Sequence, residues 1–242
     1  MKLITLNTWG TRIVEPLTAF LKKHSEVDIF LLQEIYENDS PNKPLEHPLT
    51  PVTKILTNYK GYYRRAEKGG FGLAIFIKKT IEVMEEGEVF VHGVKDATLG
   101  EQWWRDLGKN LQYLKFDCDG SQYTTFNFHG LWEPTGKNDS PNRLKQSEEI
   151  ISFMKKHSGK IVLGGDFNLR PETASIKMLE HELGLKNLIT EYGVTSTRTP
   201  LYTRSAETYA DYLFLSPQIK IKDFKVLPDV VSDHAALYVE CE

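Results

Sequence analysis

The sequence has few cysteines, no long hydrophobic run and no excess of positive charge. Only Cys118 and Cys241 occur among its 242 residues, and they lie far apart in strand-like contexts, which favours two buried thiols over a disulfide. No segment is apolar for long enough to span a membrane, so we expect no stable membrane insertion. The formal net charge of −3 gives no overall attraction to nucleic acid. Binding to a polyanion would therefore depend on local basic groups or on a metal ion.

The motifs of several common cofactor and metal sites are also missing. The sequence has no cysteine cluster for structural zinc, no Gly-Lys-Ser/Thr phosphate-binding loop and no dinucleotide-binding glycine pattern. His181-Glu182 begins like a zinc-protease motif, but Leu185 stands where that motif requires its second histidine. The N-terminus lacks the apolar core and cleavage site of a secretory signal, so the expected compartment is the cytoplasm.

Length and composition favour one α/β domain over residues 1–242. Hydrophobic residues make up 40% of the chain and charged residues 26%, which are globular values. A chain of this size can bury most of its unfolded surface in one core. Apolar, β-branched or aromatic runs predict strands over residues 2–7, 28–33, 60–65, 71–78, 81–91, 111–117, 122–129, 160–165, 209–215, 219–227 and 235–240.

Three amphipathic helices are predicted between these strands. One begins near Pro16, one begins at Ser140-Pro141, where serine can cap the helix and proline suits the first turn, and one covers residues 173–183. Their apolar stripes need a sheet surface to cover them, which indicates helices packed outside a β core. Polar stretches rich in turn-forming residues predict long loops over residues 38–51, 133–142 and 193–208.

Carboxylates follow two of the apolar runs. Asp166 and Asn168 come after Gly165, and residues two apart in an extended segment project to the same side, so both can serve one site. A turn in which they bind local backbone groups is an equal alternative. Glu34 ends a run that should be buried on both faces, so its carboxylate must be solvated, paired or bound to a metal.

Other polar residues stand at similar positions. Asn7 ends the first strand, where an amide could hold a water of a metal shell or form a turn. Asp211 precedes an apolar run and could fix the tautomer of an imidazole or pair with an arginine. His129 could stabilise charge on a phosphoryl oxygen or serve only as a structural residue. Asp233 and His234 are neighbours that would face opposite ways in a regular strand, so they must lie in a turn if both act.

The charged residues also indicate which ligands to expect. Carboxylate-rich positions suit a hard, oxygen-bound cation such as Mg²⁺ or Mn²⁺. Arg143, in the first turn of the helix that begins at Ser140-Pro141, could contact an anionic substrate.

The polar positions, taken in order, resemble the motifs of the endonuclease/exonuclease/phosphatase superfamily. This superfamily includes deoxyribonuclease I, exonuclease III, sphingomyelinases and inositol-polyphosphate phosphatases. The resemblance spans nearly the whole chain and implies a four-layer α/β/β/α sandwich with two facing mixed β-sheets and the site at one edge of the sheets. The motifs that carry it are Asn7, Gln33-Glu34, His129, Gly165-Asp166-Phe167-Asn168, Asp211-Tyr212 and Ser232-Asp233-His234.

The resemblance also implies a role for each residue. Glu34 would bind the divalent metal, with Asp233 and Asn7 completing its shell. Asp211 and His234 would form a dyad that activates water or stabilises the phosphoryl group.

Three further residues receive roles in the same way. Asp166 would orient the nucleophile or protonate the leaving oxygen, and Asn168 would position the phosphate. His129 resembles the histidine of the deoxyribonuclease, sphingomyelinase and phosphatase branches, whereas abasic-site endonucleases have tyrosine there. Abasic-DNA repair is therefore not expected.

The function implied is a Mg²⁺- or Mn²⁺-dependent hydrolase of phosphate esters, acting on a phosphorylated substrate as a monomer. A phosphodiesterase for nucleic acid or nucleotides is the first hypothesis, with the acidic net charge against it. The second is a phosphatase or phosphodiesterase for a lipid head group, an inositol phosphate or another small phosphorylated molecule. A noncatalytic binding module on the same scaffold is the third.

Overall fold

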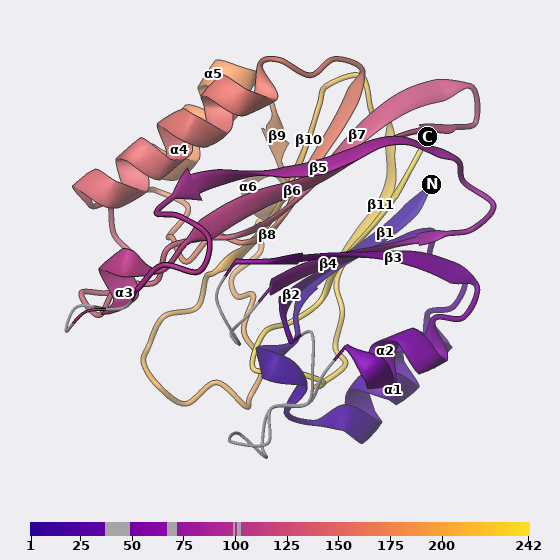
Figure 1. The fold of residues 1–242 in the computed structure, drawn as a ribbon, viewed down its shortest axis with the longest axis horizontal. Coiled ribbons are helices and arrows are strands. Elements are labelled where there is room, and N and C mark those ends of the chain that lie inside the picture. Colours follow the sequence, from indigo (N-terminus) through magenta and orange to yellow (C-terminus); the bar gives the residue numbers. More distant parts are fainter. Residues whose placement is uncertain (37–48, 67–71, 99, 101–102) are drawn as a thin grey trace.

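Two six-stranded β-sheets face each other in the computed structural model, which describes residues 1–36, 49–66, 72–98, 100 and 103–242 (Figure 1). The first sheet contains β1 (Lys2–Asn7), β2 (Ile29–Ile35), β3 (Tyr59–Arg65), β4 (Gly72–Lys78), β11 (Ile221–Val226) and β12 (Leu237–Cys241). Its strand order is β11-β12-β1-β2-β4-β3. The pair β1 and β2 is parallel, and the other pairs are antiparallel.

The second sheet is also mixed. It contains β5 (Val83–His92), β6 (Lys109–Cys118), β7 (Ser121–His129), β8 (Lys160–Asp166), β9 (Lys186–Asn187) and β10 (Asp211–Leu215). Its order is β5-β6-β7-β8-β10-β9, and only β7 and β8 run parallel.

Helices cover the outer faces of both sheets. The helices α1 (Val14–Lys23) and α2 (Thr50–Ile55) lie against the first sheet, and α4 (Pro141–Met154) and α5 (Ala174–Leu183) lie against the second (Figure 1). Shorter helical segments are η1 (Trp9–Thr11), α3 (Trp103–Asp106) and α6 (Leu188–Glu191). The predicted α/β class and the four-layer α/β/β/α sandwich are confirmed.

Strand alternation separates the layers. In β1, Ile4 and Leu6 belong to the apolar cluster that contains Leu17 and Phe20 of α1, whereas Leu3 belongs to the cluster between the sheets. The helix α4 begins as its sequence predicts, with the Ser140 side chain accepting a hydrogen bond from a backbone N–H in the first turn.

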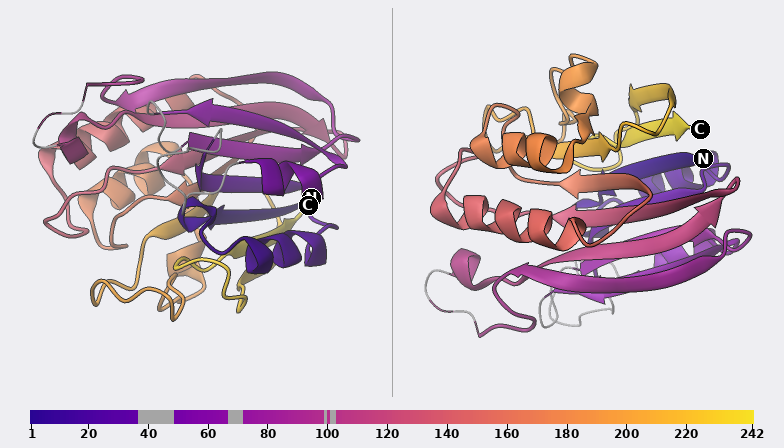
Figure 2. Two further views of the ribbon diagram at one scale, coloured as in Figure 1. Left: turned by 60° about the horizontal axis from the view of Figure 1, so that its bottom comes forward. Right: turned by 90° about the horizontal axis from the view of Figure 1, so that it is seen from above.

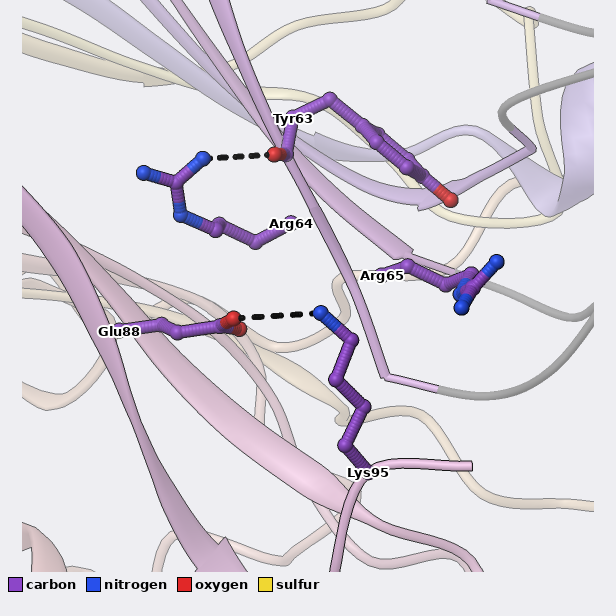
Figure 3. Close-up of a pocket in the computed structure, with 5 residues that line it drawn as sticks. All are labelled: Tyr63, Arg64, Arg65, Glu88 and Lys95. Carbon is purple, nitrogen blue, oxygen red and sulfur yellow. Dashed lines mark hydrogen bonds and ion pairs between the residues drawn. The ribbon is translucent and has the colours of Figure 1, made fainter. Parts of the chain in front are cut away.

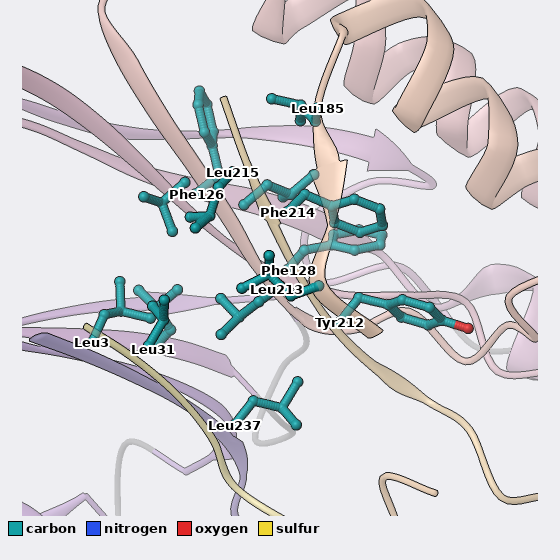
Figure 4. Close-up of a cluster of buried hydrophobic side chains, with 14 of the residues drawn as sticks. Leu3, Leu31, Phe126, Phe128, Leu185, Tyr212, Leu213, Phe214, Leu215 and Leu237 are labelled. Atoms are coloured by element: carbon teal, nitrogen blue, oxygen red, sulfur yellow. The ribbon is translucent and has the colours of Figure 1, made fainter. Parts of the chain in front are cut away.

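The core between the sheets is formed by side chains from both of them. Leu3, Leu31 and Leu237 come from the first sheet and Leu213 from the second (Figure 4). Gly164 lets the two sheets approach, because a Cβ there would lie 3.0 Å from Leu31 Cδ1 and 3.4 Å from Thr5 Cβ, both in the first sheet.

A buried polar network joins the two sheets near their centre. Gln33 Nε2 donates to Asn127 Oδ1 at 2.7 Å and to Thr5 Oγ1 at 3.1 Å. Asn127 Nδ2 donates in turn to the backbone oxygens of Leu32 and Ala74, at 3.0 and 3.2 Å. Because buried amides need partners with defined geometry, this network fixes how one sheet lies on the other.

The structure adds short elements to those predicted. The two-residue strand β9 has no sequence run of its own and forms because it pairs with β10. The helix α2 begins at Thr50, inside the stretch 38–51 predicted as a loop, with Pro51 in its first turn. The rest of that predicted loop lies almost wholly outside the described residues.

The chain ends meet at one side of the sandwich (Figure 2). The Met1 ammonium group donates to the Cys241 backbone oxygen at 2.8 Å. Cys118 and Cys241 are free thiols. Within the described ranges, no helix combines the length and the apolar character that crossing a membrane requires.

Candidate active site

The site lies where strand ends from both sheets meet. The carboxyl ends of β1 and β2 share one edge because these strands are parallel, and the same holds for β7 and β8. His129 pairs with Asp166 in register, and Asp211, at the start of the antiparallel β10, also pairs with Asp166. Asn7 Nδ2 closes the gap between the sheets by donating to Asp166 Oδ2 at 2.9 Å.

Glu34 is directed into this edge by a bulge in β2. The pairing with β4 shifts between Gln33 and Ile35, and Glu34 has a φ of 56°. Strict alternation would place Glu34 on the opposite face from its neighbour Gln33, which points between the sheets. The bulge instead brings Glu34 Oε1 within 3.0 Å of Asn7 Nδ2. A left-handed glutamate costs on the order of 1–3 kcal/mol, a strain typical of functional sites.

Asn7 bridges two carboxylates. Its amide nitrogen donates to both Glu34 and Asp166, and its Oδ1 accepts a hydrogen bond from the Trp9 backbone N–H at 2.9 Å. Asn7 therefore fixes the spacing of two acidic groups, and its position in a metal shell remains a prediction.

The pKa values of the two carboxylates shift in opposite directions. Burial raises the pKa of Glu34, and the hydrogen bond from Asn7 only partly offsets this. Burial also acts to raise the pKa of Asp166, but the opposing charges of His234 and Lys137 hold it well below its usual range. Asp166 is thus ionised, whereas burial makes the ionised form of Glu34 less favourable than in water.

His129 faces the same two acids without a short contact. Its Nε2 lies 3.8 Å from Glu34 Oε1 and 3.8 Å from Asp166 Oδ2. Burial, aided by the charge of Lys109, lowers the pKa of His129 to about 3. The imidazole is therefore neutral at physiological pH and can act as a hydrogen-bond donor.

Asp211 and His234 form a buried pair. His234 Nδ1 lies 2.9 Å from both carboxylate oxygens of Asp211, and Thr197 Oγ1 donates to Asp211 Oδ2 at 3.0 Å. Burial acts to lower the pKa of His234, but the charges of Asp211 and Asp166 raise it above its ordinary value. The other ring nitrogen, Nε2, faces Asp166 Oδ2 at 3.6 Å.

The segment Ser232-Asp233-His234 lies in a bend before β12. This agrees with the expectation that Asp233 and His234 can serve one site only if they leave the regular strand. Ser232 Oγ accepts a hydrogen bond from the His234 backbone N–H at 3.1 Å, and His234 forms an isolated β-bridge with Arg198. Asp233 is buried beside His234, with Oδ1 3.8 Å from Nε2. The structure thus places Asp233 close to the dyad, while its role as a metal ligand remains a prediction.

Asn168 lies within the same cluster. Its φ is 53°, and its backbone N–H donates to Asp166 Oδ1 at 2.9 Å. The local turn expected from the Asp-Phe-Asn spacing is therefore present within the cluster, while the role of Asn168 in positioning a phosphate remains a prediction.

Sequence reasoning missed two cations at the site. Lys137 Nζ donates to Asn168 Oδ1 at 3.0 Å, and Arg198 Nη1 contacts His234 Nε2. Both belong to predicted loops, where no strand or helix pattern marks an inward-facing side chain. Their positions next to polar residues become visible only after folding.

The expectation that Arg143 could contact an anionic substrate is not met. Its side chain is only 2% exposed, and the guanidinium donates to the backbone oxygens of Leu131, Gly136 and Asn138. Those contacts use its donors to hold the preceding loop, so Arg143 has a structural role.

The donor set fits a hard divalent cation. Glu34, His129 and Asp166 each offer a ligand atom within 4.8 Å of the others, and so do Asp166, Asp211 and His234. Carboxylate oxygens suit Mg²⁺ or Mn²⁺. A dication would also compensate the partly buried Glu34 carboxylate, whose charged form burial disfavours. Asp166 belongs to both of these groups, and metal binding by Glu34 remains a prediction.

A separate polar cavity opens between the edge strands β3 and β5 (Figure 3). Its volume is about 530 Å³, and its cations are paired: Lys95 Nζ lies 3.8 Å from Glu88, and Arg65 Nη2 lies 2.7 Å from Asp96. Because β3 runs in the same direction as β2, the cavity lies towards the same edge as the site. The other lining residues are Tyr63 and Arg64.

Comparison with known proteins agrees with this geometry. The sequence profile of the Endonuclease/Exonuclease/phosphatase family matches residues 4–234. None of the curated proteins matches this sequence.

Solved structures share the fold over the whole chain at low identity. An endonuclease/exonuclease/phosphatase family protein from Bacteroides thetaiotaomicron is 19% identical with a TM-score of 0.76, covering 100% of this chain and 94% of that one. A mannosyl-6-phosphatase from the same species is 19% identical with a TM-score of 0.75, covering 100% and 99%. The catalytic domain of human Nocturnin, with a bound sulfate anion, is 15% identical with a TM-score of 0.71, covering 100% and 94%.

Proposed function

Because this chain belongs to the endonuclease/exonuclease/phosphatase family, we propose that it is a divalent-metal-dependent hydrolase of phosphate esters. The observation that carries the proposal is the convergence of Glu34, Asp166 and the Asp211–His234 pair at one edge of the sandwich. These groups provide acidic metal ligands and a proton acceptor within a single cluster.

The residues divide the chemistry between them. Arg198 donates to His234 Nε2, so Nδ1 carries the ring proton and gives it to Asp211. In the reaction His234 Nε2 takes a proton from water as the water oxygen bonds to phosphorus and the bond from phosphorus to the ester oxygen breaks. The leaving oxygen then receives a proton through solvent, and His234 releases its proton to solvent. His129, neutral and beside Asp166, donates a hydrogen bond towards the phosphoryl group. A dication held by Glu34 would polarise the phosphoryl oxygen and neutralise developing charge.

A phosphodiester in a nucleic acid or nucleotide is the proposed substrate. Trp132 supports this choice because it follows His129 by three residues and is 41% exposed. An exposed aromatic ring so close in sequence to a site residue offers a surface on which a base can stack.

A small phosphorylated molecule is the second candidate. The net charge of −3 disfavours a long polyanion. A protein of the same fold is a mannosyl-6-phosphatase, which shows that this scaffold can accompany an activity on a sugar phosphate.

Paired chromogenic substrates separate these alternatives. We expect Mg²⁺ or Mn²⁺ to support hydrolysis of bis(p-nitrophenyl) phosphate above that of p-nitrophenyl phosphate, and EDTA to abolish it. A preference for the monoester would overturn the diester assignment. Oligonucleotides, nucleotides, sugar phosphates and lipid phosphates then define the class of substrate.

Two variants test the assignment of the site. Glu34→Ala and His234→Ala should abolish metal-dependent turnover, whereas Lys155→Ala, an exposed residue after α4 that pairs with Glu182, should retain it. Unchanged turnover in the first two variants, or no metal-dependent hydrolysis of any ester by the wild-type protein, refutes the proposal.

A further inference from the structure

We propose that Lys137 and Arg198 are the protein cations that bind the non-bridging oxygens of the substrate phosphate. The inference rests on the proposed hydrolase function and deepens it. Neither residue belongs to the motifs that identify the family in this sequence, and both contact residues that do.

Lys137 is a buried cation with unused donors. Its exposed fraction is 5%, and its ammonium group donates to the neutral Asn168 side chain at 3.0 Å. Within the described residues it forms no ion pair with a carboxylate. Nearby carboxylates, Asp166 first, act on its charge without forming an ion pair with Nζ. An ammonium group has three donors, and burial of donors without acceptors is unfavourable. The site therefore favours an additional anion next to Nζ.

Arg198 is a second cation, and its guanidinium hydrogen-bonds to an imidazole rather than to a carboxylate. Its Nη1 contacts His234 Nε2, and its Cζ lies 4.0 Å from the centroid of the Tyr202 ring. Its Nε is buried and has no hydrogen-bond partner among the residues with described side chains. Stacking on Tyr202 orients the planar guanidinium, which can bind phosphate oxygens with two parallel N–H groups.

Hydrogen bonds to its backbone fix the loop that carries Lys137. Arg143 Nη1 donates to the backbone oxygens of Gly136 and Asn138 at 2.8 and 2.6 Å, on either side of Lys137. The Lys137 backbone oxygen also accepts from the Arg170 N–H at 3.0 Å. A cation fixed in this way binds an anion without a large loss of conformational freedom.

The charge of the site requires such cations. Four carboxylates lie in the cluster, and one divalent cation would neutralise two of their charges. Lys137 and Arg198 neutralise the other two, so that an anionic ester enters without net repulsion. The four are Glu34, Asp166, Asp211 and Asp233.

Arg198 also links substrate binding to His234. In the structure Arg198 occupies the lone pair of Nε2, which the proposed reaction needs for a proton. A phosphate oxygen is a stronger acceptor for a guanidinium than a neutral imidazole is. Phosphate binding would therefore draw Arg198 to the anion and free Nε2.

Inorganic phosphate is the probe that tests this inference. Its dissociation constant is measured by calorimetry with Mg²⁺ present, for the wild-type protein and for Lys137→Met and Arg198→Met. We expect phosphate binding to weaken by about tenfold or more in each variant, as for loss of one hydrogen bond to a charged group. KM for the ester should rise in parallel, while the dissociation constant for Mg²⁺ stays within about twofold.

Matched variants separate charge from structure. Lys155→Met and Arg204→Met, both at exposed positions and the latter in the same loop as Arg198, should bind phosphate like the wild type. Arg198→Lys should recover part of the phosphate affinity because it keeps the charge but loses the planar pair of donors. Thermal unfolding of each variant monitors the fold, and Lys137→Gln replaces Lys137→Met if the latter does not fold.

The possible failures are distinguishable. A wild-type protein that hydrolyses no phosphate ester with Mg²⁺ or Mn²⁺ refutes the proposed function. A wild-type protein that is active, with folded Lys137 and Arg198 variants that bind phosphate within about twofold of it, overturns the present inference alone.

Discussion

Replacement of Asp211 by asparagine tests the organisation of the site with almost no change in shape. His234 Nδ1 lies 2.9 Å from both oxygens of Asp211, so either placement of the new amide puts an NH₂ group beside the Nδ1 proton. Two hydrogen-bond donors then face each other, and this repulsion is relieved if the ring proton moves from Nδ1 to Nε2. That nitrogen would then face the N–H groups of Arg198 as a donor and could no longer accept a proton from water.

The size of the effect follows from the distance. Two unit charges 2.9 Å apart interact with about 6 kcal/mol at an effective dielectric constant of about 20, whereas one charge-assisted hydrogen bond contributes about 1.5 kcal/mol. A loss of 1.5 kcal/mol corresponds to about a tenfold lower kcat, and a loss of 6 kcal/mol to about a 10⁴-fold lower kcat. Because the substitution also favours the wrong tautomer, we expect a loss near the upper limit.

The pH dependence provides a second measurement. The negative charge of Asp211 raises the pKa of His234, against the effect of burial. A base must be deprotonated to act, so activity falls as pH drops through this pKa. In Asp211→Asn the pKa falls, and the acid limb of the kcat profile should move to lower pH.

Nitrogen NMR of the His234 ring gives the tautomer directly. We expect Nδ1–H in the wild-type protein and Nε2–H in Asp211→Asn. Asp117→Asn, on the exposed side of β6, is the matched control and should change neither kcat nor the tautomer. The reasoning is wrong if Asp211→Asn keeps kcat within about threefold of the wild type, or if kcat falls while the tautomer stays the same.

Three further predictions test other parts of the structure. Glu34→Gln should raise the free energy of unfolding of the metal-free protein at pH 8 by on the order of 0.5–2 kcal/mol. Burial raises the pKa of Glu34 in the folded protein, so its ionised form is destabilising above the ordinary value of 4.5. Calorimetry should show a higher unfolding temperature at pH 8 and no gain below pH 4.5. Gly165→Ala should prevent folding, because the φ of Gly165 is 146° and a Cβ there would lie 1.9 Å from the Phe128 backbone oxygen. The control is Gly184→Ala, whose Cβ would meet no atom within 4 Å. It should lower the free energy of unfolding, measured with denaturant, by about 1 kcal/mol. Asn127→Ala should lower the free energy of unfolding by about 3 kcal/mol in the same assay, because it leaves buried groups that Asn127 now pairs without partners. A loss below about 1 kcal/mol would contradict the role given to the inter-sheet network.

The secondary structure could largely be predicted because its signals are local. Within the described ranges, the sequence predicts every strand longer than two residues, as well as α1, α4 and α5. Period-two and helical patterns reflect the burial of one face, and Ser140 and Pro141 mark a helix start by their own chemistry. The short elements β9 and α2 escaped because they depend on neighbours rather than on a repeating pattern.

The sequence by itself determined which polar residues stand at strand ends and their order along the chain, since both are properties of the chain read in one dimension. Tertiary structure alone decided which of them meet. The bulge at Glu34 reverses the direction that alternation predicts, and loop closure brings Lys137 and Arg198 against residues 31 and 36 positions away. It also turns Arg143 inward, away from the substrate role that its sequence position indicated. Such contacts depend on register, twist and loop path together, and no local pattern encodes those quantities.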